Sequence, residues 1–158
     1  MAPRDLLQRL LSPSEVRTTI PASPEQVYAV LSDPETYPDW LAGAQRIRHV
    51  DPSFPNPGAE FDHEVGPSKA VTMADDTTSL LADPPHRLQL EVHAGPVTGI
   101  ADFQLTPTGA STEVVLRESF IGPFGFTMPV MRGVIHARNK GSLERLKKRF
   151  EPQVIPLQ

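Results

Sequence analysis

The strongest candidate for acid–base chemistry in this sequence is a histidine in a segment of alternating apolar and polar residues. In the predicted strand 58–66, His63 shares its face with Phe61 and Val65, because successive side chains of a strand point to opposite sides of the sheet. A histidine on an inner face can relay protons near neutral pH, as enolisation, aldol cyclisation or dehydration requires. The alternative interpretation is a structural core histidine bonded to a neighbouring strand.

Two carboxylates are expected on the same inner face. Along the predicted strand 69–82, Asp75 has the parity of the apolar residues, and Asp76 points the other way unless a bulge releases both to solvent. In the strand predicted at 111–121, Glu118 also has the parity of the apolar residues. An inward carboxylate serves either as a base or as the partner of an arginine on the facing element.

The predicted C-terminal helix, 128–150, carries polar side chains on or beside its apolar stripe: Arg132, His136 and Asn139. An arginine there can hold a carboxylate or a developing enolate by charge-assisted hydrogen bonds, and an asparagine can orient a carbonyl group. Alternatively, Arg132 extends past Met128 into solvent. The predicted catalytic residues are therefore His63, Asp75, Arg132 and His136.

No cofactor and no metal ion are expected. The sequence has no cysteine, which excludes thiolate zinc sites, iron–sulfur clusters and cysteine nucleophiles. Its five histidines contain no H-x-x-x-H pair, and there is no G-x-S-x-G, Walker or dinucleotide-binding glycine pattern. Covalent or nucleotide-dependent chemistry therefore has no support in the sequence.

An α+β arrangement must position these side chains. A strand at 15–20 is followed by two helices, which begin after the N-cap residues Ser23 and Asp33. From Arg46 onward the hydrophobic period is two, which predicts an antiparallel meander. Its strands are expected at 45–51, 58–66, 69–82, 86–94, 98–106 and 111–121. One long helix, 128–150, then closes the chain.

This arrangement predicts an internal cavity. Only the C-terminal helix is long enough to cover one face of a seven-stranded sheet, and a sheet that curves around it diverges from it at one end. Large side chains or a ligand must fill that gap, and aromatic residues make up only 6% of the sequence. We therefore expect a pocket of a few hundred to ~1,000 Å³. The alternative is complete filling by aliphatic side chains.

Length and composition indicate one globular domain. The 158 residues are 39% hydrophobic and 22% charged, and residues 14–150 are expected to form the core, with an amphipathic helix appended in 1–12 and a tail at 151–158. A net charge of −4 argues against nucleic-acid binding. No apolar run reaches the ~18–20 residues of a membrane span, and the start lacks a signal-peptide pattern, so a cytoplasmic location is expected. The leucines of the appended helix are a candidate homodimer contact.

The segment from Ile20 to Trp40, IPASPEQVYAVLSDPETYPDW, together with the element order, resembles the START/SRPBCC helix-grip superfamily, specifically its polyketide cyclase/dehydrase and lipid-transport branch. The resemblance spans roughly 14–150 and extends to the stretches 58–61, 84–88, 111–114 and 142–148. It implies a curved seven-stranded sheet wrapped around the C-terminal helix, with two short helices between the first two strands. The expected ligand-binding residues are Tyr37, Trp40, Phe61, Met73, Phe103, Glu118, Phe120, Met128, Met131, Ile135 and Asn139; Tyr37 and Trp40 are also candidate core wedges.

Three functions are compatible with this resemblance. The first is a cofactor-independent cyclase or dehydratase that folds a polyketide-type substrate in the cavity and moves protons within it. Such cyclases typically present an arginine on the central strands, whereas residues 71–79 offer acids and threonines instead. The second is a carrier or sensor of a lipid-like molecule, with 122–126 as a hinge. The third is a protein-interaction module with an incidental pocket.

Overall fold

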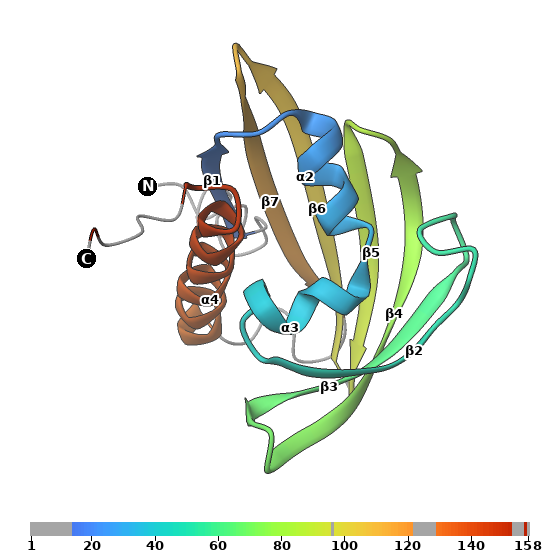
Figure 1. Cartoon of the computed structure of the whole chain (residues 1–158). Coiled ribbons are helices and arrows are strands. Elements are labelled where there is room, and N and C mark those ends of the chain that lie inside the picture. Colours follow the sequence, from blue (N-terminus) through green and yellow to red (C-terminus); the bar gives the residue numbers. More distant parts are fainter. Residues whose placement is uncertain (1–13, 96, 122–128, 153–156, 158) are drawn as a thin grey trace, which may run out of the picture.

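The computed structural model describes residues 14–95, 97–121, 129–152 and 157 (Figure 1). The helix expected within 1–12 and the hinge expected at 122–126 lie outside these residues. In chain order the elements are β1 (Ser14–Ile20), α2 (Pro24–Leu31), a short 3-10 turn (Pro34–Thr36), α3 (Tyr37–Trp40), β2 (Ala44–Val50), β3 (Glu60–Ser68), β4 (Val71–Asp83), β5 (Arg87–Ala94), β6 (Val97–Thr108), β7 (Ser111–Ile121) and α4 (Pro129–Lys148).

The strands form one antiparallel sheet in the order β1-β7-β6-β5-β4-β3-β2. Figure 1 shows the sheet curving around the helices, with α4 beside β1 and β7 and with α2 and α3 in front of the central strands. This is the helix-grip arrangement expected from the sequence. All seven strands lie within a few residues of their predicted positions, because proline-containing turns separate the alternating segments.

Local capping fixes the start of the helical segment that follows β1. Ser23 caps α2: its hydroxyl accepts from the Gln26 backbone N–H at 3.2 Å, and the Gln26 side chain accepts from the Ser23 backbone N–H at 3.0 Å. Asp33 similarly accepts from the backbone N–H of Glu35 at 3.1 Å. Both caps agree with the sequence prediction. The short α3, which carries Tyr37 and Trp40, follows directly after the second of these starts.

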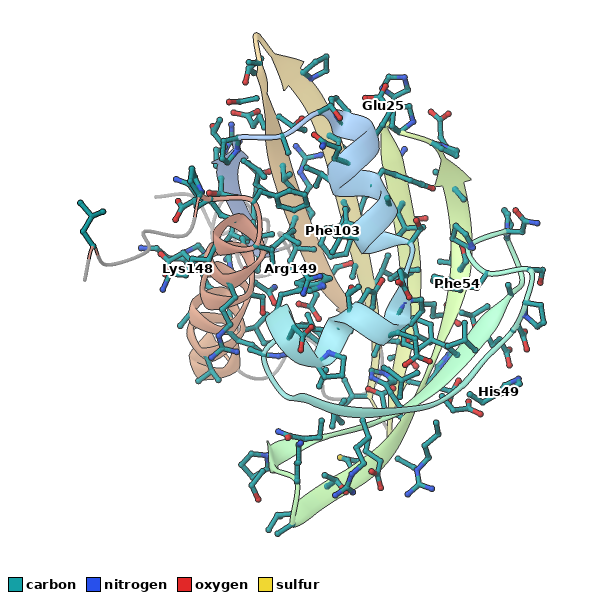
Figure 2. All side chains as sticks on the ribbon, viewed as in Figure 1. Glu25, His49, Phe54, Phe103, Lys148 and Arg149 are labelled. Atoms are coloured by element: carbon teal, nitrogen blue, oxygen red, sulfur yellow. The ribbon has the colours of Figure 1, made fainter. Side chains whose placement is uncertain are left out.

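The core lies between the concave face of the sheet and the helices. Trp40, Leu146 and Leu143 are almost completely buried and belong to one hydrophobic cluster. Figure 2 shows Phe103 in this interior, whereas Glu25, His49 and Lys148 lie on the outside. Arg149 donates to Asp39 at 3.0 Å and so joins the end of α4 to α3. The helices and the sheet therefore bury a common apolar interior.

The outer face of the sheet carries a histidine between two carboxylates. Nδ1 of His93 lies 2.8 Å from Asp76 Oδ2, and its Nε2 lies 2.8 Å from Glu91 Oε1. The hydrogen bond with Asp76 raises the pKa of His93 above its ordinary value. The outward orientation of His93 and Glu91 agrees with the alternation of β5.

We expect the substitution Asp76→Asn to lower the pKa of His93, because it removes the charge-assisted hydrogen bond that favours the imidazolium. In the folded protein the pKa of His93 lies above its unfolded value of about 6.5. The pair therefore stabilises the protein fully below the unfolded pKa, and this stabilisation is lost as the pH rises through the folded pKa. An NMR titration of the histidine ring protons measures the shift. An unchanged His93 titration in the variant would contradict this account.

Candidate functional site

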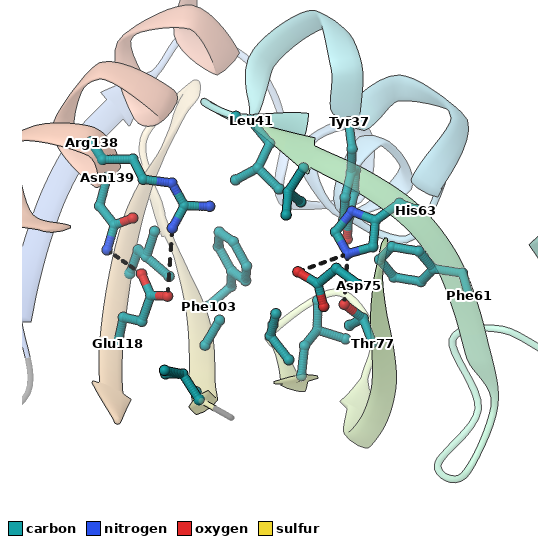
Figure 3. A pocket seen from close by; sticks show the side chains of 18 of the residues that line it. Tyr37, Leu41, Phe61, His63, Asp75, Thr77, Phe103, Glu118, Arg138 and Asn139 are labelled. Atoms are coloured by element: carbon teal, nitrogen blue, oxygen red, sulfur yellow. Dashed lines mark hydrogen bonds and ion pairs between the residues drawn. The ribbon is translucent and has the colours of Figure 1, made fainter. Parts of the chain in front are cut away.

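A pocket lies between the concave face of the sheet and the helices α3 and α4 (Figure 3). Its volume is about 300 Å³, at the lower end of the range for small-molecule sites. The aromatic part of its wall consists of Tyr37, Trp40, Phe61, Phe103 and Phe120. The aliphatic part consists of Leu41, Val65, Leu90, Val92, Val97, Ala101 and Leu116. A wall of this composition favours an apolar ligand.

One wall of the pocket carries a buried histidine and aspartate on neighbouring strands. His63 of β3 and Asp75 of β4 are directly paired in the antiparallel register, so both side chains project from the concave face. Their residues are only 4% and 6% exposed. His63 Nε2 lies 3.5 Å from Asp75 Oδ2 and 3.3 Å from the hydroxyl of Thr77, two residues further along β4. Figure 3 shows the three side chains grouped beside Phe61.

The contacts of His63 Nε2 determine what the other ring nitrogen can do. An ionised carboxylate only accepts hydrogen bonds, so Asp75 favours the ring form that carries its proton on Nε2. Nδ1 then presents a lone pair. Among the described residues, neither His63 Nδ1 nor Asp75 Oδ1 has a hydrogen-bond partner, although both atoms are buried. The pair therefore combines an unpartnered ring nitrogen with a neighbouring carboxylate, an arrangement that can support proton transfer at the ring.

A second polar group lies on the opposite side of the pocket (Figure 3). Glu118 of β7 accepts a hydrogen bond from the amide of Asn139 of α4 at 2.6 Å, and both residues are buried. Nη1 of Arg138 lies 3.9 Å from the other carboxylate oxygen of Glu118. Glu118 therefore links the sheet to α4. Pairing with an arginine of the facing element was one of the two roles that the sequence left open for it.

Arg138 also fixes the chain segment between α3 and β2. Its Nε donates to the carbonyl of Ala42 at 3.0 Å, while the Ala42 N–H donates to the hydroxyl of Ser142 at 2.9 Å. Leu41 and Gly43 on either side of Ala42 line the pocket. The segment 41–43 and α4 together thus form one edge of the site.

Tyr37 and Trp40 are core residues and pocket residues at the same time. The Tyr37 hydroxyl donates to the Leu31 carbonyl at 2.5 Å, and burial raises the pKa of Tyr37 well above its ordinary range. Trp40 donates from its ring N–H to the hydroxyl of Thr36 at 3.1 Å and contacts Tyr37 edge to face. These hydrogen bonds occupy their polar atoms, so both side chains present aromatic carbon to the pocket.

Several residues expected at the site lie elsewhere. Arg132 and His136 are exposed and do not line the pocket. Both stand in the first two turns of α4, before the buried Asn139. His136 instead approaches the Ser14 hydroxyl at 3.5 Å. Met73 is 47% exposed because it stands at the end of the β3–β4 hairpin, which projects beyond the helices in Figure 1.

The other expected residues divide into three groups. Ile135 is partly buried in α4 but is not part of the pocket wall. The expectation for Met128 and Met131 concerns side chains outside those that the structure describes. Of the residues proposed for the site, those that line the pocket are Tyr37, Trp40, Phe61, His63, Asp75, Phe103, Glu118, Phe120 and Asn139.

The sequence reasoning missed Arg138 and Thr77. A signal existed for Thr77, which has the parity of Asp75 in β4. None existed for Arg138, because its contacts depend on tertiary structure. The segment 41–43 had no comparable signal, because its place against α4 depends on tertiary contacts.

The described residues hold no group of three or more histidine and acidic side chains arranged to bind a metal ion. Among these same residues, no helix combines the length and the apolar character needed to cross a membrane.

The chain shares its fold with proteins of known structure. It is similar to the protein CV1439 from Chromobacterium violaceum, with a TM-score of 0.71, 20% identity, and coverage of 89% of this chain and 99% of that one. It is also similar to DynU16, a protein in the dynemicin biosynthetic locus, with a TM-score of 0.64, 16% identity, and coverage of 87% and 46%. CalU16 from Micromonospora echinospora has a TM-score of 0.62, 17% identity, and coverage of 87% and 75%. These TM-scores demonstrate a common fold. The comparison with curated proteins gave no significant match.

The curved sheet that grips a long C-terminal helix over a pocket defines a protein of the SRPBCC helix-grip class. The family model described as "Polyketide cyclase / dehydrase and lipid transport" matches residues 14–151. The chain belongs to this family, as the resemblance in the sequence indicated.

Proposed function

We propose that this chain binds a hydrophobic, polyketide-type small molecule in the pocket and promotes its cyclisation and dehydration, with His63 as the acid–base residue. The observation that carries the proposal is the buried pair of His63 and Asp75 in an otherwise apolar pocket, with Nδ1 of the imidazole unpartnered among the described residues. The family to which the chain belongs supports a hydrophobic ligand, and its name includes both cyclases and dehydrases.

The proposed reaction is an intramolecular aldol condensation. His63 Nδ1 takes a proton from a carbon beside one carbonyl group, and the resulting enolate forms a carbon–carbon bond to a second carbonyl of the same molecule. The imidazolium, stabilised by Asp75, returns the proton to the new alkoxide. Loss of the hydroxyl group as water, after removal of a second proton from the same carbon, gives the cyclic enone. The net change is a diketone converted to an enone and one water, with no external oxidant or reductant.

Two physical effects would supply the acceleration. The apolar wall holds the substrate in a folded conformation that places the two reacting carbons close together. Such positioning removes the entropy cost of bringing them together in solution. Proton transfer by a positioned base typically contributes ~10²–10⁴-fold. The contact between His63 and Asp75 at 3.5 Å is long, as such contacts often are before a substrate is bound.

A suitable test uses a linear diketone whose two carbonyl groups can close a six-membered ring. The folded protein is expected to bind this probe and to increase the rate at which the ultraviolet absorption of the cyclic enone appears. Native mass spectrometry of the freshly purified protein identifies any molecule that the pocket retains. Binding without any acceleration would contradict the catalytic proposal and favour a carrier, which the lipid-transport part of the family name supports as the second candidate.

A further inference from the structure

The polar part of the pocket wall includes two buried carboxylates. Asp75 and Glu118 stand on opposite sides of the pocket, and their side chains are 3% and 9% exposed. Such burial leaves little water to screen their charges, and a second anion placed among them would meet both repulsion and the cost of losing its own hydration.

The guanidinium group in the described wall is already engaged. Arg138 lies 3.9 Å from Glu118 through Nη1 and donates from Nε to the carbonyl of Ala42. An incoming carboxylate would therefore have to compete with Glu118 for this charge and disturb the segment that closes the pocket. Among the described lining residues, the one arginine therefore already faces a carboxylate, which an anionic ligand would have to share.

The polar atoms of the His63–Asp75 pair that lack a partner are acceptors. Asp75 Oδ1 accepts hydrogen bonds, and His63 Nδ1 accepts one when Nε2 carries the proton. Both atoms are buried and unpartnered within the described part of the chain, and both belong to residues that line the pocket. A buried acceptor without a partner costs free energy, so a ligand that donates a hydrogen bond here removes that cost. A hydroxyl group is such a donor, and a carboxylate is not.

We propose that the pocket selects uncharged ligands that carry a phenolic or enolic hydroxyl group, which it places against His63 and Asp75, and that it excludes the same carbon skeleton when it carries a carboxylate. This inference rests on the proposed ligand-binding function and specifies the chemistry of the bound molecule. It also agrees with the proposed reaction, in which the same two residues meet an enol.

The test compares three aromatic probes of similar size by calorimetry near neutral pH: naphthol, methoxynaphthalene and naphthoate. Naphthol is expected to bind at least ~10-fold more tightly than methoxynaphthalene, which lacks the donor, because a hydrogen bond to a charged group contributes about that much. Naphthoate is expected to bind more weakly than either. Quenching of Trp40, the single tryptophan and a residue of the pocket wall, reports whether each probe occupies the pocket.

A matched pair of variants separates the pocket carboxylate from a general charge effect. Asp75→Asn is expected to reduce the preference for naphthol over naphthoate by ~10-fold or more, because it removes one buried charge and one acceptor. Asp76→Asn, on the same strand but on the outer face, is expected to leave that preference unchanged.

The outcomes distinguish this inference from the function on which it rests. If all three probes bind with equal affinity and quench Trp40, the selectivity is wrong while the binding function stands. If naphthoate binds most tightly, the inference is equally overturned. If none of the probes binds, the ligand-binding function and the selectivity fall together. The comparison of probes needs only the unmodified protein, so a variant that does not fold leaves the test intact.

Discussion

Replacing His63 by glutamine is expected to lower the protein-dependent rate of diketone ring closure by ~10²–10⁴-fold, the usual contribution of a positioned base. Glutamine has a similar reach and can still bond to the hydroxyl of Thr77, but it cannot take up a proton at the position of Nδ1. The pocket wall is otherwise unchanged, so binding of the probe should alter much less than turnover. The measurement is the initial rate of enone absorption over a range of probe concentrations up to saturation, which separates kcat from KM.

Two controls accompany this prediction. His93→Gln removes a histidine from the outer face of the sheet, away from the pocket, and is expected to leave turnover unchanged. Asp75→Asn keeps His63 but removes the carboxylate that orients it, so a lower kcat with a largely preserved KM is expected. Circular dichroism establishes that each variant is folded. Full turnover in a folded His63→Gln protein would refute the role of this residue in the reaction.

The fold could be predicted from the sequence because its determinants are local. The alternation of apolar residues, the capping boxes and the proline-containing turns each act over a few residues, and together they specify the order of strands and helices. The register shift between Ser79 and Leu81 in β4 was not predicted. It lies beyond Asp75 and Thr77, so the parity of β4 still gives the face on which both side chains lie.

The site could be predicted more completely on the strands than on the helix, where Asn139 lines the pocket but Arg132 and His136 do not. A strand has only two faces, so identifying the inner one at Phe61 also places His63. A helix surface is continuous, and its buried stripe matters only where another element covers it. Arg132 lies seven residues before Asn139 and therefore on nearly the same helix face, yet it is exposed. The contacts of Arg138 with Ala42 and Glu118 depend on three elements meeting in space, which periodicity does not reveal.

The core and the pocket share a wall, and this makes Trp40 the most consequential position for stability. It is completely buried, contacts Tyr37 and Phe103 edge to face, and lines the pocket. Trp40→Ala is expected to lower the free energy of unfolding by ~3–5 kcal/mol, through the loss of buried apolar surface and the enlarged cavity. Urea unfolding followed by circular dichroism measures this change without relying on tryptophan emission.

Leu146→Ala provides the matched comparison, because Leu146 is also fully buried but does not line the pocket. It is expected to cost ~2–5 kcal/mol while leaving the affinity of the folded protein for naphthol unchanged. Val134→Ala, at a site that is 55% exposed on the same helix, should stay within ~0.5 kcal/mol of the parent protein. Of these three variants, only Trp40→Ala is expected to alter the naphthol affinity of the folded protein. If Leu146→Ala weakened binding as much as Trp40→Ala does, the wall assigned to Trp40 would not be the ligand-contacting surface.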